Sequence, residues 1–493
     1  MSSEAKKFLI ASSIMTGSRL AERLLGLIST LIIARVLVPS DFGIIAIAML
    51  FVMLIDILSQ SGAQQYIVHK TEVSDEDLNT AWTLNLLLKS ALVLVIFLAA
   101  PLVANFYEDS RLTDVLMAMS LCAPIMALSS PDLLIKIRDQ RYEYVAKIMV
   151  ITKFVGITIS ISLALIYQNY WALIAGQVGS SISRCALSYI FLPRFPKLTL
   201  KRIHEQWSFS KWMMLKEVLG YLRSQSDMLL VGKFYSLSSM GGYHISKYIS
   251  SMPTTELLQP ALAPLLATFS KKKNNKTELL RQANVVMIVL TILVVPIAIY
   301  LHVFSEQIVG LLLGSQWIDY HLIFGMMALL AISNEVVRVP STILTAKGEV
   351  KFLFYYDVIS SLTVVAVLFM LKDSLLTIFV LGKVVAEFIM AFIFSLIVAR
   401  NLGAKRQFLS QINIMIVYTI FIFTIAKICQ FIVQDMSLEV VQLIISGVLF
   451  ISLSLLLLFI MYHAGMKKRD DVIFVVFTSS KVWRSILEKL KKV

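Results

Sequence analysis

Apolar stretches of about twenty residues recur along the whole chain, separated by short polar or charged segments. A helix of that length crosses the roughly 30 Å hydrocarbon core of a bilayer. The pattern therefore predicts an all-α polytopic membrane protein with about 14 transmembrane helices. We expect these spans near residues 13–37, 42–63, 80–105, 113–133, 144–167, 170–192, 208–234, 240–267, 282–304, 318–345, 352–371, 374–399, 410–432 and 438–463.

Composition agrees with a membrane protein and excludes several other classes. The 493 residues are 58% hydrophobic and 15% charged, with a mean hydropathy of +0.80. Three Cys stand singly and six His lack ligand spacing, so no disulfide framework, metal site or cofactor is expected. Residues 1–7 run directly into the first span without a cleavage-site pattern, so we expect no cleaved signal peptide.

The basic residues between spans predict the orientation of the chain. About 29 of the 45 Lys and Arg residues fall on one alternate set of loops and about 4 on the other. Because positive loops stay inside, this set is expected in the cytoplasm, with both termini there. The net charge of +14 then reflects topology, and no nucleic-acid partner is expected.

An internal repeat appears at an offset of 198 residues, which places residues 33–43 on residues 231–241. Both segments read span, basic residue, short turn, glycine, span, although any two amphipathic hairpins share some of this pattern. Six spans per copy predict two six-helix lobes related by a pseudo-two-fold axis along the membrane normal, plus two C-terminal helices. The predicted domains are 1–200, 201–402, 403–465 and a basic tail at 466–493, which reads as an interfacial amphipathic helix or an ordinary solvated tail.

Cations inside spans are the candidate functional groups. One at mid-bilayer costs roughly 2.5–3.5 kcal/mol on insertion scales, so it calls for water, a counter-ion or an anionic ligand. In the first span Arg19 and Arg23 are four residues apart and share a helix face, and Glu22 can neutralise one of them. Two interpretations remain open: an interfacial turn with snorkelling arginines, or the cationic wall of a cavity.

The seventh span repeats this character with Lys216, Arg223 and Asp227. These positions and Gly220 fall on one helical stripe. Arg223 and Asp227, four residues apart, either satisfy each other or leave the arginine to line a cavity.

Lys247, Arg338 and Asp56 complete the candidate set, whereas Lys383 is set aside because Glu387 can pair with it locally. Lys247 has no acid within one helical turn, whereas Arg338 has Glu335 three residues before it and Lys383 has Glu387 four residues after it. Asp56 lies among apolar residues, where ion coupling and a permanent salt bridge are both possible. We therefore expect substrate-binding cations at Arg19, Arg23, Lys216, Arg223, Lys247 and Arg338, and ion-coupling or salt-bridge roles for Glu22, Asp56 and Asp227.

Two hairpins carry a resemblance to a known family. The matching residues are Ala34, Arg35, Pro39, Asp41, Phe42, Gly43, Asp56, Gly62 and Ala63 in the first copy and Gln225, Asp227, Gly232, Gly242, Tyr243 and Pro253 in the second. They resemble bacterial polysaccharide flippases of the Wzx type, close to the colanic-acid and teichuronic-acid exporters of the multidrug, oligosaccharidyl-lipid and polysaccharide superfamily. Gln64, Gln65 and Tyr66 depart from the small, apolar residues usual there, which leaves the packing at that point in doubt.

The resemblance implies alternating access around a cationic central cavity, with no covalent chemistry. Its implied substrate is an undecaprenyl-diphosphate-linked oligosaccharide for O-antigen, capsule or exopolysaccharide, and its implied location is the bacterial cytoplasmic (inner) membrane. Anionic membrane lipids, a polysaccharide polymerase and chain-length machinery are the other expected partners. The alternatives are a small-molecule or drug antiporter of the same superfamily, whose cavity should be acidic for cationic drugs, and a membrane saccharide polymerase or ligase, which needs larger external loops than this chain has.

Overall fold

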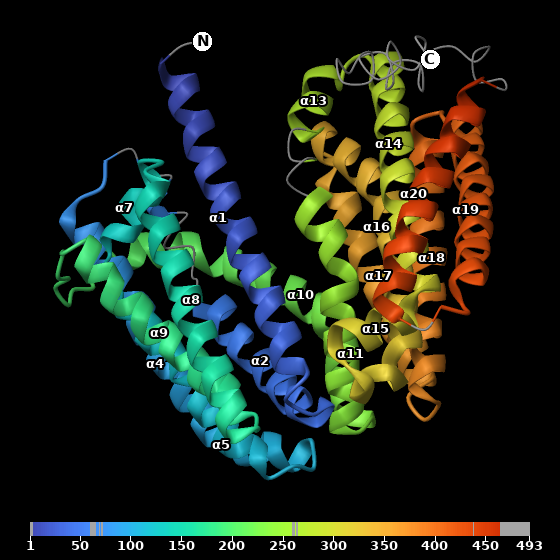
Figure 1. Cartoon of the computed structure of the whole chain (residues 1–493). Helices are drawn as coiled ribbons and strands as arrows, with labels where there is room; N and C mark the ends of the chain where they lie inside the picture. Colours follow the sequence, from blue (N-terminus) through green and yellow to red (C-terminus); the bar gives the residue numbers. More distant parts are fainter. Residues whose placement is uncertain are drawn as a thin grey trace. The chain divides into compact units, whose positions relative to one another are not determined.

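The computed structural model describes residues 3–59, 66–68, 70, 72–258, 262, 265–436 and 438–463, and every regular element in those ranges is helical (Figure 1). Density of contacts divides the chain into two compact units, residues 1–245 and 246–493. The two lobes predicted from the sequence repeat, which divide at residue 200, remain a prediction. A division by residue contacts need not fall at the boundary between two repeats. The basic tail, Gln64 and Gln65 lie outside the described residues.

The first unit holds the helices α1 to α10 and most of α11. Their bounds are α1 Ser3–Ala34, α2 Pro39–Ser59, α4 Asp75–Phe106, α5 Arg111–Ser120, α6 Cys122–Ala127, α7 Asp132–Arg138, α8 Tyr142–Tyr167, α9 Trp171–Phe191, α10 Ile203–Phe234 and α11 Leu237–Met252. Within this unit α8 packs against both α9 and α1, and α10 packs against α2. The first helix of the predicted second repeat therefore contacts helices of the first.

The second unit begins inside α11 and continues through η1 to α20. Its bounds are η1 Pro253–Leu258, α13 Leu265–Lys272, α14 Lys276–Val303, α15 Ser305–Leu313, η2 Ser315–Tyr320, α16 His321–Lys347, α17 Val350–Met370, α18 Leu376–Asn401, α19 Lys405–Val433 and α20 Glu439–His463. The element η1 is a π-helical turn that starts at Pro253, where the proline lacks the N–H that would continue the α-helical ladder.

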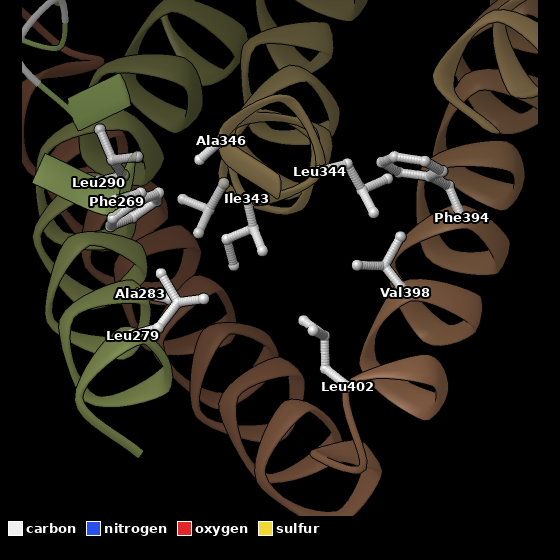
Figure 2. Close-up of a cluster of buried hydrophobic side chains, with 11 residues drawn as sticks. Phe269, Leu279, Ala283, Leu290, Ile343, Leu344, Ala346, Phe394, Val398 and Leu402 are labelled. Atoms are coloured by element: carbon white, nitrogen blue, oxygen red, sulfur yellow. The ribbon is translucent and has the colours of Figure 1, made fainter. Parts of the chain in front are cut away.

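A buried apolar cluster holds α13, α14, α16 and the end of α18 together (Figure 2). Phe269 is fully buried and lies close to Ile343 of α16, while Leu344 on the same helix points towards Phe394. Aliphatic positions of α16 thus pack against neighbours on two sides. This arrangement matches the long apolar pattern of its sequence.

Nine helical segments of the described chain are long and apolar enough to cross a bilayer, or ten if the bent pair Arg111–Ala127 and Asp132–Arg138 is one span. The chain is therefore an all-α, multi-span membrane protein. Three long helices outside that set, α1, α9 and α10, have 32, 21 and 32 residues. Polar residues lower the hydropathy of these three helices below that of a typical span. In α1 and α10 they include the charged candidates Arg19, Arg23 and Arg223. A helix is present at each of the other predicted spans, and the segment 240–267 lies partly outside the described residues.

Candidate functional site

The α1 candidates lie on the half of the helix that precedes its apolar run. Arg19 and Arg23 are exposed and Glu22 is partly buried, whereas Ile33 and Ala34 at the far end are buried. The polar half of α1 therefore presents two guanidinium groups on one face. Such groups bind anionic oxygens through a planar fork of N–H donors.

On α10, Arg223 is exposed and Asp227 is only 3% exposed. The carboxylate of Asp227 accepts a hydrogen bond of 2.5 Å from the hydroxyl of Tyr243 on α11. The side chain of Lys216 lies outside the described part of the chain. A buried carboxylate held by a tyrosine fixes the register of α10 against α11, which the sequence spacing alone did not indicate.

Asp56 has a specific partner in the first unit. The Nζ of Lys89, on α4, lies 2.9 Å from its Oδ1, and Lys89 is only 6% exposed while the Asp56 side chain is 31% exposed. Salt-bridge formation and ion coupling were both left open for Asp56, and the structure shows the salt bridge. Whether it also serves ion coupling stays a prediction.

The same region holds a second cation that the sequence pattern did not single out. Arg184 of α9 lies within electrostatic range of Glu22 from α1 and of Asp56 from α2. Four helices therefore each contribute one charge to a cluster of two acids and two bases. Arg184 lies near the end of the span predicted at residues 170–192, and its sequence position does not indicate partners on α1 and α2.

Two cations of the second unit, Arg338 and Lys383, form ion pairs with acids on their own helices. Nε of Arg338 lies 3.0 and 2.9 Å from the two carboxylate oxygens of Glu335, which is 7% exposed. Lys383 lies 3.7 Å from Glu387. Both local pairs predicted from helical spacing are present. Lys247 is partly exposed on α11.

A reciprocal contact joins the first turns of α2 and α11. A Cβ added at Gly43 would lie 2.0 Å from the carbonyl oxygen of Leu237, and one added at Gly241 would lie 1.8 Å from that of Pro39. The offset that aligns the two glycines also aligns Pro39 with Leu237. Equivalent atoms of two similar segments thus exchange the same contact, as at an isologous interface.

Within the described ranges, no group of three or more His, Cys, Asp or Glu side chains could hold a metal ion. The described candidates are charged side chains, of which Arg19, Arg23 and Arg223 are exposed and Asp227 and Glu335 are buried.

Solved structures show which fold this membrane protein has. The chain is similar to the lipid II flippase MurJ in an inward closed conformation, with a TM-score of 0.70 and 16% identity over 93% of this chain and 100% of that one. It is also similar to a multidrug resistance MATE family transporter of the MOP superfamily in an inward-facing conformation, with a TM-score of 0.59 and 13% identity over 78% and 96% of the two chains. The protein is a multi-span membrane protein with the MurJ and MATE fold.

The family follows from sequence. A family described as polysaccharide biosynthesis protein matches residues 32–322, which is more than half of the chain, so the chain belongs to that family. It is 26% identical to the succinoglycan biosynthesis transport protein ExoT of Rhizobium meliloti over 337 residues, 66% of this chain and 67% of that protein. It is 21% identical to the lipopolysaccharide biosynthesis protein WzxC of Escherichia coli over 360 residues, 72% of each. The resemblance to the polysaccharide flippase family is confirmed.

Proposed function

We propose that the protein flips an undecaprenyl-diphosphate-linked oligosaccharide from the inner to the outer leaflet of the bacterial cytoplasmic membrane. The head group would cross by alternating access, for surface polysaccharide biosynthesis, and without covalent chemistry. Membership in a family of polysaccharide biosynthesis transport proteins supports the substrate class. Similarity to a lipid II flippase supports a fold suited to lipid-linked cargo.

The observation that carries this proposal is the pair of exposed arginines on α1, Arg19 and Arg23, together with exposed Arg223 on α10. A diphosphate brings several anionic oxygens, and each guanidinium can donate two parallel hydrogen bonds to them. A cationic drug would be repelled by the same groups. The charge of the described candidates therefore favours the flippase over the small-molecule antiporter.

The proposal includes fourteen spans with both termini in the cytoplasm. To the nine apolar segments it adds the bent pair Arg111–Ala127 and Asp132–Arg138 as one span, together with α1, α9, α10 and α11. At 32 residues, α1 and α10 are each about 48 Å long, which exceeds the thickness of the hydrocarbon core. Two six-helix lobes with a pseudo-two-fold axis are also proposed, supported by the reciprocal contact of Gly43 and Gly241.

Other charged residues are proposed to act along the same path. Lys216, Lys247 and Arg338 are proposed to extend the cationic path, and Glu22, Asp56 and Asp227 to balance or couple it. Anionic membrane lipids, polymerase and chain-length machinery are the proposed partners besides the lipid-linked cargo. The tail that would meet anionic lipids lies outside the described residues.

The test is export of lipid-linked oligosaccharide in a strain that lacks the native gene and carries variants of it. Arg19→Gln, Arg23→Gln and Arg223→Gln are each expected to lower export at least about tenfold, since each removes a charged hydrogen-bond donor. Lys427→Gln is the matched control, because Lys427 is an exposed intramembrane cation bonded to Gln430 on the same helix.

Full export by the triple arginine variant would contradict the site. Accumulation of the intermediate on the cytoplasmic face of the deletion strain would support flipping over polymerisation. Efflux of a cationic dye by the purified protein, without transport of the lipid-linked cargo, would instead support the antiporter.

A further inference from the structure

The linker between α9 and α10, residues 192–202, lies along the start of α4. Three of its backbone N–H groups donate to side-chain oxygens of α4, and the pairs are Lys197 with Asn79 at 3.0 Å, Thr199 with Thr83 at 3.2 Å and Arg202 with Thr80 at 3.4 Å. Thr80 and Thr83 are 0% and 3% exposed, so this part of α4 is covered.

The covered face of α4 continues as an exposed apolar stripe. The stripe consists of residues three, four or seven apart in the sequence: Thr80, Thr83, Leu87, Leu94 and Leu98. Its three leucines are 48%, 63% and 73% exposed, and α4 is long and apolar enough to cross a bilayer. Exposed leucines of a spanning helix face lipid, because water around them is unfavourable. The linker therefore lies between the start of α4 and the bilayer.

Aromatic side chains with bound polar ends adjoin the linker. The hydroxyl of Tyr189, in the last turn of α9, donates to the carbonyl oxygen of Leu128 at 2.7 Å. The indole N–H of Trp82, next to Thr83 on α4, donates to the carbonyl oxygen of Ser129 at 3.0 Å. Tyr and Trp are enriched where a membrane meets water, since their rings are apolar and their tips are polar. These residues place the linker at the depth of that boundary.

Two side chains of the linker are apolar and uncovered. Phe195 is 77% exposed and Leu198 is 74% exposed. The ring of Phe195 stacks on that of Tyr189, with 5.1 Å between the centroids and 12° between the planes. Ile190, the neighbour of Tyr189 on α9, is 70% exposed. The apolar surface of α9 thus extends onto the linker, where lipid chains are a more favourable surrounding than water.

Most charges around the linker pair with one another. The ion pairs are Lys201 with Glu76 at 2.7 Å, Arg194 with Asp75 at 3.3 Å and with Asp132 at 2.9 Å, and Arg202 with Glu205 at 2.9 Å. The hydrogen bond from Lys201 lowers the pKa of Glu76, so this acid stays ionised beside its partner. The acids at the start of α4 are therefore balanced by cations of the linker.

Lys197 differs from these paired cations. Its side chain is exposed, and its ammonium group has no ion pair or hydrogen bond among the residues that the structure describes. In the sequence it stands between Phe195 and Leu198. A lysine at a membrane boundary keeps its aliphatic stem against apolar atoms while its ammonium reaches the level of the lipid phosphates.

We infer that the linker is a membrane-contact surface, in which Phe195 and Leu198 enter the edge of the hydrocarbon core and the ammonium of Lys197 binds the phosphate of a phospholipid head group. The partner is the phospholipid of the bilayer itself and not the transported cargo. The contact does not depend on the proposed function, because it involves only the linker and the surrounding lipid. Phospholipid then holds the chain between α9 and α10 at a fixed depth.

Spin labels test this depth in the full-length protein in phosphatidylglycerol liposomes, with Cys122, Cys185 and Cys429 replaced by serine. Labels at Phe195→Cys and Leu198→Cys should be relaxed more strongly by oxygen, which concentrates in lipid, than by a water-soluble nickel chelate. A label at Asp139→Cys, an exposed residue before α8, should show the opposite order. Preference for the nickel chelate at both linker sites overturns the inference.

The same labels in native membrane vesicles distinguish lipid from a protein partner. The preference for oxygen at both linker sites should persist there. Labels that the nickel chelate reaches in liposomes, and that neither reagent reaches in native membranes, would show that a protein covers the linker and would overturn the inference.

The head-group contact is tested on the full-length protein with its natural cysteines. A phosphatidylglycerol analogue with a photoactivatable diazirine in its head group should label the linker peptide in liposomes. Lys197→Gln should lower this labelling about two- to fivefold, the range for one exposed ion pair, whereas Lys197→Arg keeps the charge and should retain it. Equal labelling of Lys197→Gln and the unaltered protein overturns the contact. Neither measurement involves the cargo, so the outcomes are separate from those that test the proposed function.

Discussion

Gly156 of α8 and Gly176 of α9 face each other so closely that neither position has room for a side chain. A Cβ on Gly176 would lie 2.7 Å from the carbonyl oxygen of Gly156 and 1.7 Å from the hydroxyl of Ser160, and the reciprocal clash occurs at Gly156 with Ser180. Each helix therefore contributes a glycine and a serine four residues later. Small residues at this spacing allow close helix packing inside a membrane.

The first prediction is that Gly176→Ala destabilises the protein by about 1–3 kcal/mol, because the added methyl group would push two backbones apart. Gly179→Ala is the matched control on the same helix. Its Cβ would meet only the terminal methyl of Ile159, at 2.4 Å, which can turn away. Thermal unfolding in detergent measures both variants, and equal loss of stability in the two would contradict the packing argument.

The second prediction concerns the contact between α2 and α11. Gly241→Ala should lower the free energy of unfolding by about 1–3 kcal/mol, because the new Cβ would overlap the backbone of Pro39. Gly17→Ala is the control and should not lower it, since nothing lies within 4 Å of a Cβ at that position and alanine stabilises a helix interior relative to glycine by about 0.5–1 kcal/mol. A tolerated Gly241→Ala would show that the two helix ends are not in contact.

The third prediction concerns Asp56 and Lys89. Asp56→Asn should cost about 3–5 kcal/mol, because it leaves the buried ammonium of Lys89 without its partner. Lys89→Met should cost less, since Asp56 is the more exposed member and water can reach it.

The double variant of Asp56 and Lys89 separates structure from transport. It should recover much of the stability lost by Asp56→Asn, because no unpaired buried charge remains. If its export recovers as well, the pair is structural. If stability returns and export does not, Asp56 has a role in transport that the salt bridge alone does not explain.

The fourth prediction asks whether Arg338 binds substrate. Arg338→Gln leaves Glu335 buried without its partner, so it should destabilise the protein by about 3–5 kcal/mol and reduce export for that reason alone. Glu335→Gln combined with Arg338→Gln removes both charges and should restore stability. Export measured in this double variant at matched protein levels then decides the role, since a substrate-binding Arg338 predicts that export stays low.

Local spacing predicted some of this structure and could not predict the rest. The pairs of Glu335 with Arg338 and of Lys383 with Glu387 were foreseeable, because residues three or four apart on a helix are neighbours. The partner of Asp56 was not, since Lys89 lies on another helix and its distance in the sequence carries no geometric information. The proximity of Arg184 to Glu22 and Asp56 was not predicted for the same reason.

The repeat shows a similar limit. The sequence offset paired Gly43 with Gly241, yet similarity of two segments does not imply that they touch. The apolar pattern predicted helices at positions where the structure has them. Hydropathy alone does not identify α1 and α10 as membrane spans, because their polar residues lower the mean hydropathy of each helix.

The linker between α9 and α10, residues 192–202, is hydrogen-bonded to the start of α4. The two segments should tolerate mutation to different degrees. Lys197, Thr199 and Arg202 contribute backbone N–H groups, which every residue except proline supplies. Asn79, Thr80 and Thr83 contribute side-chain oxygens, which few residues supply. Most residues of the linker can therefore be substituted without loss of its hydrogen bonds to α4. In distant relatives, the polar residues of α4 and the length of the linker should be better markers of this contact than the sequence of the linker.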